Sequence, residues 1–237
     1  GFTLSDQDFE AIAQSAYKHF GLAMSSSKKP LVSARLARRL RKQNVLNFKD
    51  YLARLNGPNS DKERSNLLSL LTTNVTQFFR EPHHFETMRK DVLPDLIKKA
   101  REGGRVRIWS AGCSNGQEPY TLAMIIQDMC PEVNRLDFKI LGTDIDPVVV
   151  QTATAAKYPA DEIAQIPAEY RKYLPKLDAD GRLPESIRSM VTLGVLNLIE
   201  PFPFKGQFDA IFCRNVVIYF ETAKQQHVWK AFHRHHV

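Results

Sequence analysis

Arg105–Met124 reads RVRIWSAGCSNGQEPYTLAM, and the rest of the chain is organised around it. The segment begins with apolar residues at alternate positions, Val106 and Ile108, which is typical of a buried strand. It then passes through two glycines, Gly112 and Gly116, and ends in apolar residues at helical spacing. A strand, a glycine turn and a helix are the first unit of a doubly wound α/β sheet, and ligands bind at such turns.

The glycine turn narrows the class of ligand. Its spacing, G-x-x-x-G, matches neither the dinucleotide fingerprint nor the P-loop. Glu118 lies at the start of the predicted helix, where a phosphate group would need free N–H groups and no neighbouring carboxylate. An acid here suits a cationic, hydroxyl-rich ligand without phosphate, such as S-adenosylmethionine. The alternative is that Glu118 only complements the helix dipole, and the turn by itself leaves both open.

Length and composition limit the class of protein. The 237 residues can hold one large domain, or a medium domain with a small one. No apolar run approaches the length of a membrane span, and no apolar signal segment stands at the start, so we expect a cytoplasmic protein without membrane insertion. The three cysteines are widely spaced, which fits a reducing compartment and predicts no metal site.

The net charge of +7 is concentrated in the first part of the chain. Residues 1–100 hold 17 Lys and Arg against 10 Asp and Glu, whereas residues 101–237 hold 16 of each kind. An acidic partner is therefore expected to meet the first part. Five cations lie on one predicted helix within residues 31–44: Arg35, Arg38, Arg39, Arg41 and Lys42. They form either a docking surface or a plain solvated face.

Hydrophobic periodicity divides the chain into two predicted domains. Residues 1–75 show four helical patterns and predict a small all-α domain, in which Ser60 and Glu63 form a capping box for the fourth helix. Residues 76–237 predict an α/β domain. Within it, residues 157–190 lack sustained periodicity and are expected to be an insertion between sheet elements.

The second predicted strand, residues 138–144, ends in an acid. Asp144 is placed to accept hydrogen bonds from both hydroxyls of a ribose. A helix cap before the following proline is the other possible role of an acid here, and it fits Asp146 better than Asp144. The sequence therefore predicts Asp144 as a ligand-binding residue.

Two more strands are predicted further along the chain. Residues 191–198 form one candidate, and residues 208–215 form the clearest strand of all, a continuous apolar run. That run ends in Arg214 and Asn215. Because sites in open α/β sheets lie at the carboxyl ends of the strands, both side chains should line the pocket.

Three stretches together resemble one known family. They are residues 73–85 (TNVTQFFREPHHF), 108–120 (IWSAGCSNGQEPY) and 208–220 (FDAIFCRNVVIYF). Each is similar to a motif of the CheR family of bacterial chemotaxis receptor methyltransferases, and the resemblance covers nearly the whole chain. It implies a Rossmann-like, S-adenosylmethionine-dependent methyltransferase domain. It also implies a small all-α N-terminal domain that docks the receptor and a small inserted β-subdomain at residues 157–190.

The resemblance further implies the residues of the active site. The family's cofactor contacts fall here on Asn74, Thr76, Arg80, Gly112, Glu118, Asp144, Asn197, Leu198, Arg214 and Asn215. Family mechanisms give Arg80 and Tyr219 roles near the transferred methyl group. The glycine loop departs mildly from the family, with Asn115 and Gln117 in place of the usual Thr and Glu. The family continues with further strands and a Gly-His-Ser-Glu motif, whereas this chain stops at Val237, so those strands are expected to be missing.

The expected reaction transfers a methyl group from S-adenosylmethionine to glutamate side chains on the cytoplasmic helices of chemoreceptors, leaving S-adenosylhomocysteine. One alternative is a catalytically weak module that binds these cofactors and only contacts receptors. The other, a nucleic-acid methyltransferase, is disfavoured. Residues 214–217 (RNVV) replace the Asp/Asn-Pro-Pro-aromatic loop of amino-group methyltransferases, and no row of stacking aromatics accompanies the basic residues. We expect a monomer that binds no nucleic acid.

The loop at residues 173–184 bears on the choice of receptor. It holds one glycine, Gly181, in an Asp-Gly turn, which favours a tight hairpin. A loop this short leaves little room to hold a receptor-tail pentapeptide as an added strand. The enzyme is therefore expected to act without such a pentapeptide.

Overall fold

The computed structural model describes residues 3–58, 60–72, 76–174, 181–214, 216, 220 and 222–237. The chain forms two compact units. Unit 1 comprises residues 1–74 and 216–228, and unit 2 comprises residues 75–215 and 229–237. In the part of the chain that the structure describes, no helix is both long and apolar enough to cross a lipid bilayer.

Unit 1 is helical, as its periodicity predicts. Its elements are α1 (Asp6–Phe20), the 3₁₀ turn η1 (Ser26–Lys28), α2 (Lys29–Lys42), α3 (Phe48–Asn56) and α4 (Asp61–Leu71). Ser5 caps α1, because its hydroxyl accepts a hydrogen bond of 3.0 Å from the Asp8 N–H, and Gly21 ends the helix at a φ of 71°. Leu36 and Leu40 lie fully buried in the helical core. The first part of α12 (Thr222–His235) also belongs to this unit.

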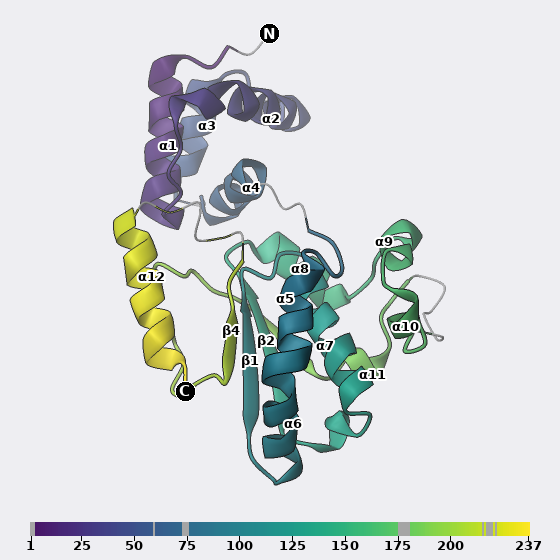
Figure 1. The fold of residues 1–237 in the computed structure, drawn as a ribbon. Coiled ribbons are helices and arrows are strands. Elements are labelled where there is room, and N and C mark those ends of the chain that lie inside the picture. Colours follow the sequence, from purple (N-terminus) through teal and green to yellow (C-terminus); the bar gives the residue numbers. More distant parts are fainter. Residues whose placement is uncertain are drawn as a thin grey trace. The chain divides into compact units, whose positions relative to one another are not determined.

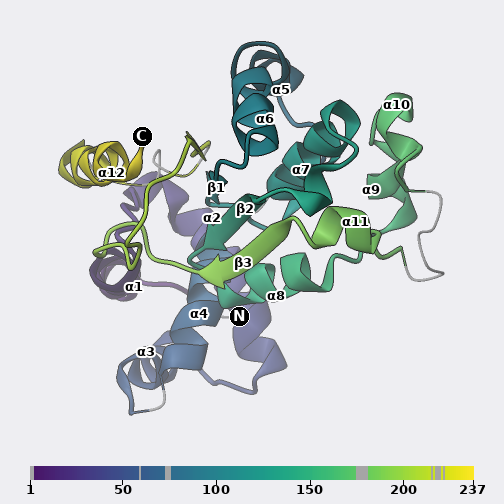
Figure 2. The same ribbon diagram turned by 90° about the horizontal axis from the view of Figure 1, so that it is seen from below.

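Unit 2 alternates helices and strands. Its elements run α5 (Pro82–Thr87), the π-helical η2 (Met88–Val92), α6 (Leu93–Arg101), β1 (Val106–Ala111), α7 (Gln117–Met129), η3 (Val133–Arg135), β2 (Phe138–Asp144), α8 (Pro147–Ala155), α9 (Ala160–Ala164), α10 (Ala168–Arg171), α11 (Glu185–Arg188), β3 (Val191–Val195) and β4 (Ala210–Phe212). The described strands form one parallel sheet in the order β3-β2-β1-β4. Figure 1 labels β4, β1 and β2, and Figure 2 labels β1, β2 and β3. The chain leaves β1 for β2 on one side and places β4 on the other, which creates a topological switch point beside β1.

Helices cover both faces of the sheet, as in a doubly wound fold. Figure 2 shows α6 and α7 on one side of the strands and α8 on the other. The first face buries Val106 and Ile108 of β1. On the second face Trp109, which is fully buried, packs among the rings of Phe202, Phe204, Phe208 and Phe232. Its indole N–H donates to the Thr143 hydroxyl at 2.9 Å, so the polar handle of this core residue is satisfied.

The strand predictions are confirmed for β1 and β2 and are too long for the other two strands. β3 ends at Val195 instead of residue 198, and β4 covers only Ala210–Phe212 of the predicted residues 208–215. Asp209 sets the start of β4. Its N–H donates to the Arg107 carbonyl at 2.8 Å, but its carboxylate accepts from the Arg107 N–H at 2.7 Å and from the Lys99 ammonium at 2.6 Å, so one ladder bond is replaced by a side chain.

In residues 157–190, where a β-subdomain is predicted, the described elements are short helices. Their described part holds α9, α10 and α11 and one antiparallel bridge, Lys157 to Arg182, while residues 175–180 lie outside the described residues. Each short helix begins after a proline with extended backbone, at Pro159, Pro167 and Pro184. Proline fixes a φ that is compatible with this position and needs no hydrogen-bond donor, which favours a helix start.

Candidate active site

The glycine turn after β1 is held by its backbone. The N–H groups of Gly112 and Cys113 both donate to the Thr143 carbonyl on β2, at 2.7 and 2.8 Å. Gly112 and Gly116 have φ values of 78° and 94°, which favour glycine. A Cβ on Gly116 would lie 2.9 Å from the Tyr158 hydroxyl oxygen. Gly116 therefore lets Tyr158 pack directly against the turn. Gly112 lies beside the end of β2, where its N–H meets the Thr143 carbonyl.

Asp144 closes this turn from the end of β2. One carboxylate oxygen accepts from the Ser114 N–H at 2.8 Å and the other from the Asp146 N–H at 3.1 Å. Burial raises the pKa of the Asp144 carboxyl above its usual value, and these backbone donors oppose the shift. Asp146 caps α8, because its carboxylate accepts from the Val148 N–H at 2.9 Å, as the sequence predicts.

Glu118 and Arg214 form an ion pair beside the switch point. The Arg214 Nε donates to one Glu118 oxygen at 2.7 Å, and the Ser110 hydroxyl donates to the other at 2.7 Å. Only 12% of the Glu118 side chain and 14% of the Arg214 side chain are exposed. Glu118 thus does more than complement the dipole of α7, since it joins the ends of β1 and β4.

Arg214 also holds the turn that carries Arg80. Its Nη1 donates to the Arg80 carbonyl at 2.8 Å and reaches the Glu81 carboxylate at 3.3 Å. The guanidinium lies 5.0 Å from the centre of the Phe85 ring, in a cation–π contact. The sequence reasoning missed Glu81 and Phe85, because their contacts join segments more than 100 residues apart.

Of the remaining predicted site residues, three cofactor residues are described, whereas two cofactor residues and the predicted catalytic Tyr219 are not. Asn197 and Leu198 follow β3, and the Leu196 N–H donates to the Asp144 carbonyl at 2.9 Å, which ties this segment to the end of β2. Thr76 is partly exposed. Asn74, Asn215 and Tyr219 lie outside the described residues.

The side chains at this end of the sheet fit S-adenosylmethionine. The Asp144 carboxylate is an acceptor of the kind that ribose hydroxyls need. Beside it, the Ser114 hydroxyl is buried and has no hydrogen-bond partner in the described part of the chain, so a polar ligand group would satisfy it. The Arg214 charge is compensated by Glu118, which leaves Asp144 to set the sign of the local charge. This set favours a hydroxyl-rich cation over a phosphate.

The five predicted docking cations on α2 divide into two kinds. Arg39 donates to both oxygens of Glu63, at 2.6 and 2.7 Å, and Arg35 donates to the Leu70 carbonyl at 2.7 Å. Burial raises the pKa of the Glu63 carboxyl, but the hydrogen bonds and the charge of Arg39 outweigh burial, so the pKa lies below its usual value. The predicted capping box is wrong for this reason: Glu63 binds Arg39, and Ser60 makes no side-chain cap bond. The remaining cations, Arg38, Arg41 and Lys42, are exposed.

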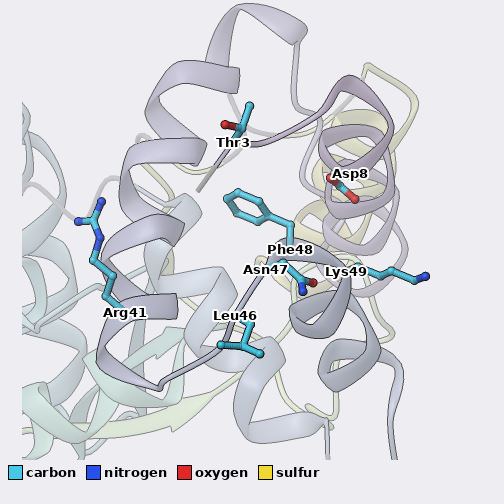
Figure 3. Close-up of a pocket in the computed structure, with 7 residues that line it drawn as sticks. All are labelled: Thr3, Asp8, Arg41, Leu46, Asn47, Phe48 and Lys49. Carbon is cyan, nitrogen blue, oxygen red and sulfur yellow. The ribbon is translucent and has the colours of Figure 1, made fainter. Parts of the chain in front are cut away.

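A pocket lies next to this surface within unit 1. It has a volume of about 480 Å³, and it is lined by Thr3, Asp8, Arg41, Leu46, Asn47, Phe48 and Lys49. Figure 3 shows these side chains, which come from the ends of α1, α2 and α3. The Arg41 and Lys49 cations outnumber its one acid, Asp8, so the pocket extends the basic surface.

Comparison with known proteins identifies the family of the chain. The model described as "CheR methyltransferase, SAM binding domain" matches residues 74–236, and "CheR methyltransferase, all-alpha domain" matches residues 7–72. A probable chemotaxis protein methyltransferase of Rhizobium etli is 42% identical over 91% of this chain and 82% of its own length. The chemotaxis protein methyltransferases of Borreliella burgdorferi and Escherichia coli are 37% and 34% identical over 97% of this chain, and 83% and 79% of their own lengths. The chain therefore belongs to the CheR family of S-adenosylmethionine-dependent chemotaxis methyltransferases.

Proposed function

We propose that the protein methylates glutamate side chains on the cytoplasmic helices of chemoreceptors. The observation that carries this proposal is the carboxylate of Asp144 beside the unpartnered hydroxyl of Ser114, at the carboxyl end of the sheet. The Glu118–Arg214 pair adjoins it and connects it to the turn that carries Arg80. The cofactor residues Asn74, Thr76, Gly112, Asn197, Leu198 and Asn215 complete the proposed set by their match to the family motifs.

Methyl transfer to a carboxylate requires alignment of the acceptor oxygen with the methyl group, and it requires no general base. A glutamate carboxylate has an ordinary pKa of about 4.3, so it is already a nucleophile at neutral pH. S-adenosylmethionine supplies the electrophilic methyl group when it is bound. We assign to Arg80 the task of holding the acceptor carboxylate, and to Tyr219 a position near the transferred methyl group. Holding the acceptor in this way can supply several kcal/mol through proximity and orientation.

The exposed part of α2 is the proposed docking surface for the receptor. Arg38, Arg41 and Lys42 are exposed, and the adjoining pocket adds Lys49. An acidic methylation region of a receptor complements this charge. Arg35 and Arg39 are assigned a structural role, because their side chains bond to α4. Reversal of two exposed charges, Arg38→Glu with Lys42→Glu, should raise the apparent KM for a receptor fragment and flatten its salt dependence. Unchanged KM and salt dependence would remove α2 from the docking surface.

Three finer features complete the proposal. The enzyme acts in the cytoplasm, where the receptor helices that it methylates are found. It acts as a monomer. It also needs no receptor-tail pentapeptide. Residues 175–180 of the loop lie outside the described residues, but at Gly181 the backbone packs against Tyr158, whose N–H donates to the Gly181 carbonyl at 3.1 Å. A Cβ on Gly181 would lie 2.4 Å from the Tyr158 carbonyl oxygen, so the described end of the loop has no spare room. Calorimetric titration with such a peptide should give no heat.

Asp144 provides the test of the cofactor site. Asp144→Asn keeps the shape of the side chain and removes its charge, so the affinity for S-adenosylhomocysteine should fall by about 1–3 kcal/mol, or roughly 5- to 150-fold. Asp161→Asn, at an exposed position of α9, is the matched control and should bind as the unmodified protein does. Equal affinities for both variants by calorimetry, with both folded, would remove Asp144 from the site. A radiolabelled methyl-transfer assay with receptor cytoplasmic fragments then tests the reaction itself.

A further inference from the structure

The turn that carries Arg80 has an unusual backbone. Phe79 and Glu81, on either side of Arg80, have φ values of 55° and 56°. Residues other than glycine rarely adopt this left-handed backbone conformation, and it persists only where the surrounding structure imposes it. The question is therefore which contacts hold this turn.

One contact comes from the middle of α7. The Phe79 N–H donates to the Thr121 hydroxyl at 3.1 Å. Thr121 is fully buried, and it is a polar residue in a helix whose neighbouring positions are apolar. α7 itself is anchored, since the Tyr120 hydroxyl next to Thr121 donates to the Ala153 carbonyl of α8 at 2.9 Å. Thr121 thus connects the turn at Phe79 to α7, a helix that is itself bonded to α8.

Two other contacts act on the same turn from different directions. The Phe79 ring stacks on Tyr170 at 4.8 Å with 27° between the planes, and the Tyr170 hydroxyl accepts from Arg89 at 3.0 Å. On the other side of Arg80, its carbonyl accepts from Arg214. These contacts fix the Phe79 side chain and the Arg80 carbonyl. Of these contacts, only the one from the Thr121 hydroxyl reaches the N–H of Phe79, and it fixes the peptide plane between Phe78 and Phe79, from which the left-handed φ of Phe79 begins.

We propose that Thr121 is a positioning residue for Arg80: its hydroxyl fixes the left-handed Phe79 backbone, and this aims the Arg80 side chain at the acceptor carboxylate. The inference rests on the proposed role of Arg80 in methyl transfer. Loss of the hydroxyl leaves the partly buried Phe79 N–H without this acceptor, so the turn relaxes toward a commoner backbone conformation. Arg80 then points away from its productive position while Asp144 and Ser114 are undisturbed.

The test compares three variants. Thr121→Val has the same shape and no hydroxyl, and Thr121→Ser keeps the hydroxyl. Thr154→Val is the same substitution on α8, where the hydroxyl donates to the Val150 carbonyl of its own helix at 2.8 Å. For Thr121→Val we expect kcat to fall about 10- to 100-fold, because a small misplacement costs that much. The Kd for S-adenosylhomocysteine and the KM for cofactor should stay within about twofold. Thr121→Ser and Thr154→Val should keep kcat within about threefold of the unmodified protein.

Amide hydrogen exchange tests the same idea without activity. The Phe79 N–H should exchange at least about tenfold faster in Thr121→Val than in Thr121→Ser, because it has lost its acceptor. Equal exchange rates, or an equal loss of kcat in the valine and serine variants, would overturn the proposal. An unaltered kcat in Thr121→Val would do so as well. If Thr121→Val does not fold, Thr121→Ala takes its place in the comparison with serine. An unmodified protein that transfers no methyl group to receptor fragments would refute the proposed function, and the exchange rates would still decide whether Thr121 holds the turn.

Discussion

Removal of Arg214 should destabilise unit 2 far more than removal of an ordinary surface arginine. Its side chain and that of Glu118 are only 14% and 12% exposed, and they meet at 2.7 Å. Loss of one partner of a buried pair leaves the other charge uncompensated, which costs about 3–5 kcal/mol. Arg214→Gln also loses the bond to the Arg80 carbonyl. The bond to Glu81, which is 39% exposed, adds little. We therefore expect a loss of about 3 kcal/mol.

Urea unfolding followed by tryptophan fluorescence measures this loss in unit 2 alone. Trp109 is fully buried in that unit, and Trp229→Phe in every variant removes the second tryptophan, which adjoins the unit 1 part of α12. With a slope of about 2–3 kcal/mol per molar urea, a loss of 3 kcal/mol moves the midpoint down by about 1–1.5 M. Arg101→Gln is the control, because its pair with Glu132 has the same distance of 2.7 Å but is half exposed. It should move the midpoint by less than about 0.4 M.

A double-mutant cycle isolates the pair itself. Glu118→Gln leaves Arg214 with the Arg80 carbonyl and Glu81, so it should cost less, about 1–2 kcal/mol. The free energy of unfolding that the double variant loses should be smaller than the sum of the two single losses by about 1–3 kcal/mol. If Arg214→Gln shifts the midpoint no more than the Arg101→Gln control, or if the two single losses simply add, the pair does not hold the ends of the strands together.

Gly116→Ala should destabilise unit 2 by more than about 1 kcal/mol, whereas Gly103→Ala should cost less, as measured by thermal unfolding. Both glycines have positive φ values, 94° and 86°, but only at Gly116 would the new Cβ lie within 3 Å of a neighbour. Asp128 titrates in the acid range. Burial raises the pKa of its carboxyl, but hydrogen bonds from a lysine, an arginine and a tyrosine outweigh burial and lower the pKa to about 2 from 3.8. Its contribution, about 1 kcal/mol after allowance for exposed partners, is complete above pH 4 and is lost as the pH falls toward 2. Asp128→Asn should therefore flatten the decline in stability over that window.

The sequence was most informative where a pattern depends on local spacing. The strands β1 and β2, the glycine turn, the place of Asp144 at the end of β2 and the cap formed by Asp146 follow from apolar runs and the polar residues after them. β4 was predicted too long, because the run looks continuous while Asp209 turns its carboxylate onto the backbone of β1. Nothing in local spacing indicates that a side chain will take the place of a ladder bond.

Partners distant in the sequence were beyond such reasoning. Arg39 looked like one of five equivalent cations, yet Glu63 on α4 binds it with both oxygens. Glu63 in turn could not serve the predicted capping box. Thr121 lies inside the stretch from which the fold was predicted. A polar residue among buried positions of an apolar helix was the available signal, but its acceptor role requires the turn at Phe79, 42 residues earlier in the chain.

Unit 1 is built from two segments that lie far apart in the chain, and this has a consequence for its folding during biosynthesis. Residues 216–228 belong to the same compact unit as residues 1–74, and within it Leu22 bridges to Phe220 while the Lys224 ammonium lies 3.5 Å from the centre of the Tyr17 ring. A ribosome adding about 5–20 residues per second needs roughly 7–30 s to make the intervening segment. The helices α1 to α4 therefore leave the ribosome well before residues 216–228, which complete their unit, and any chaperone that protects them must act over that interval.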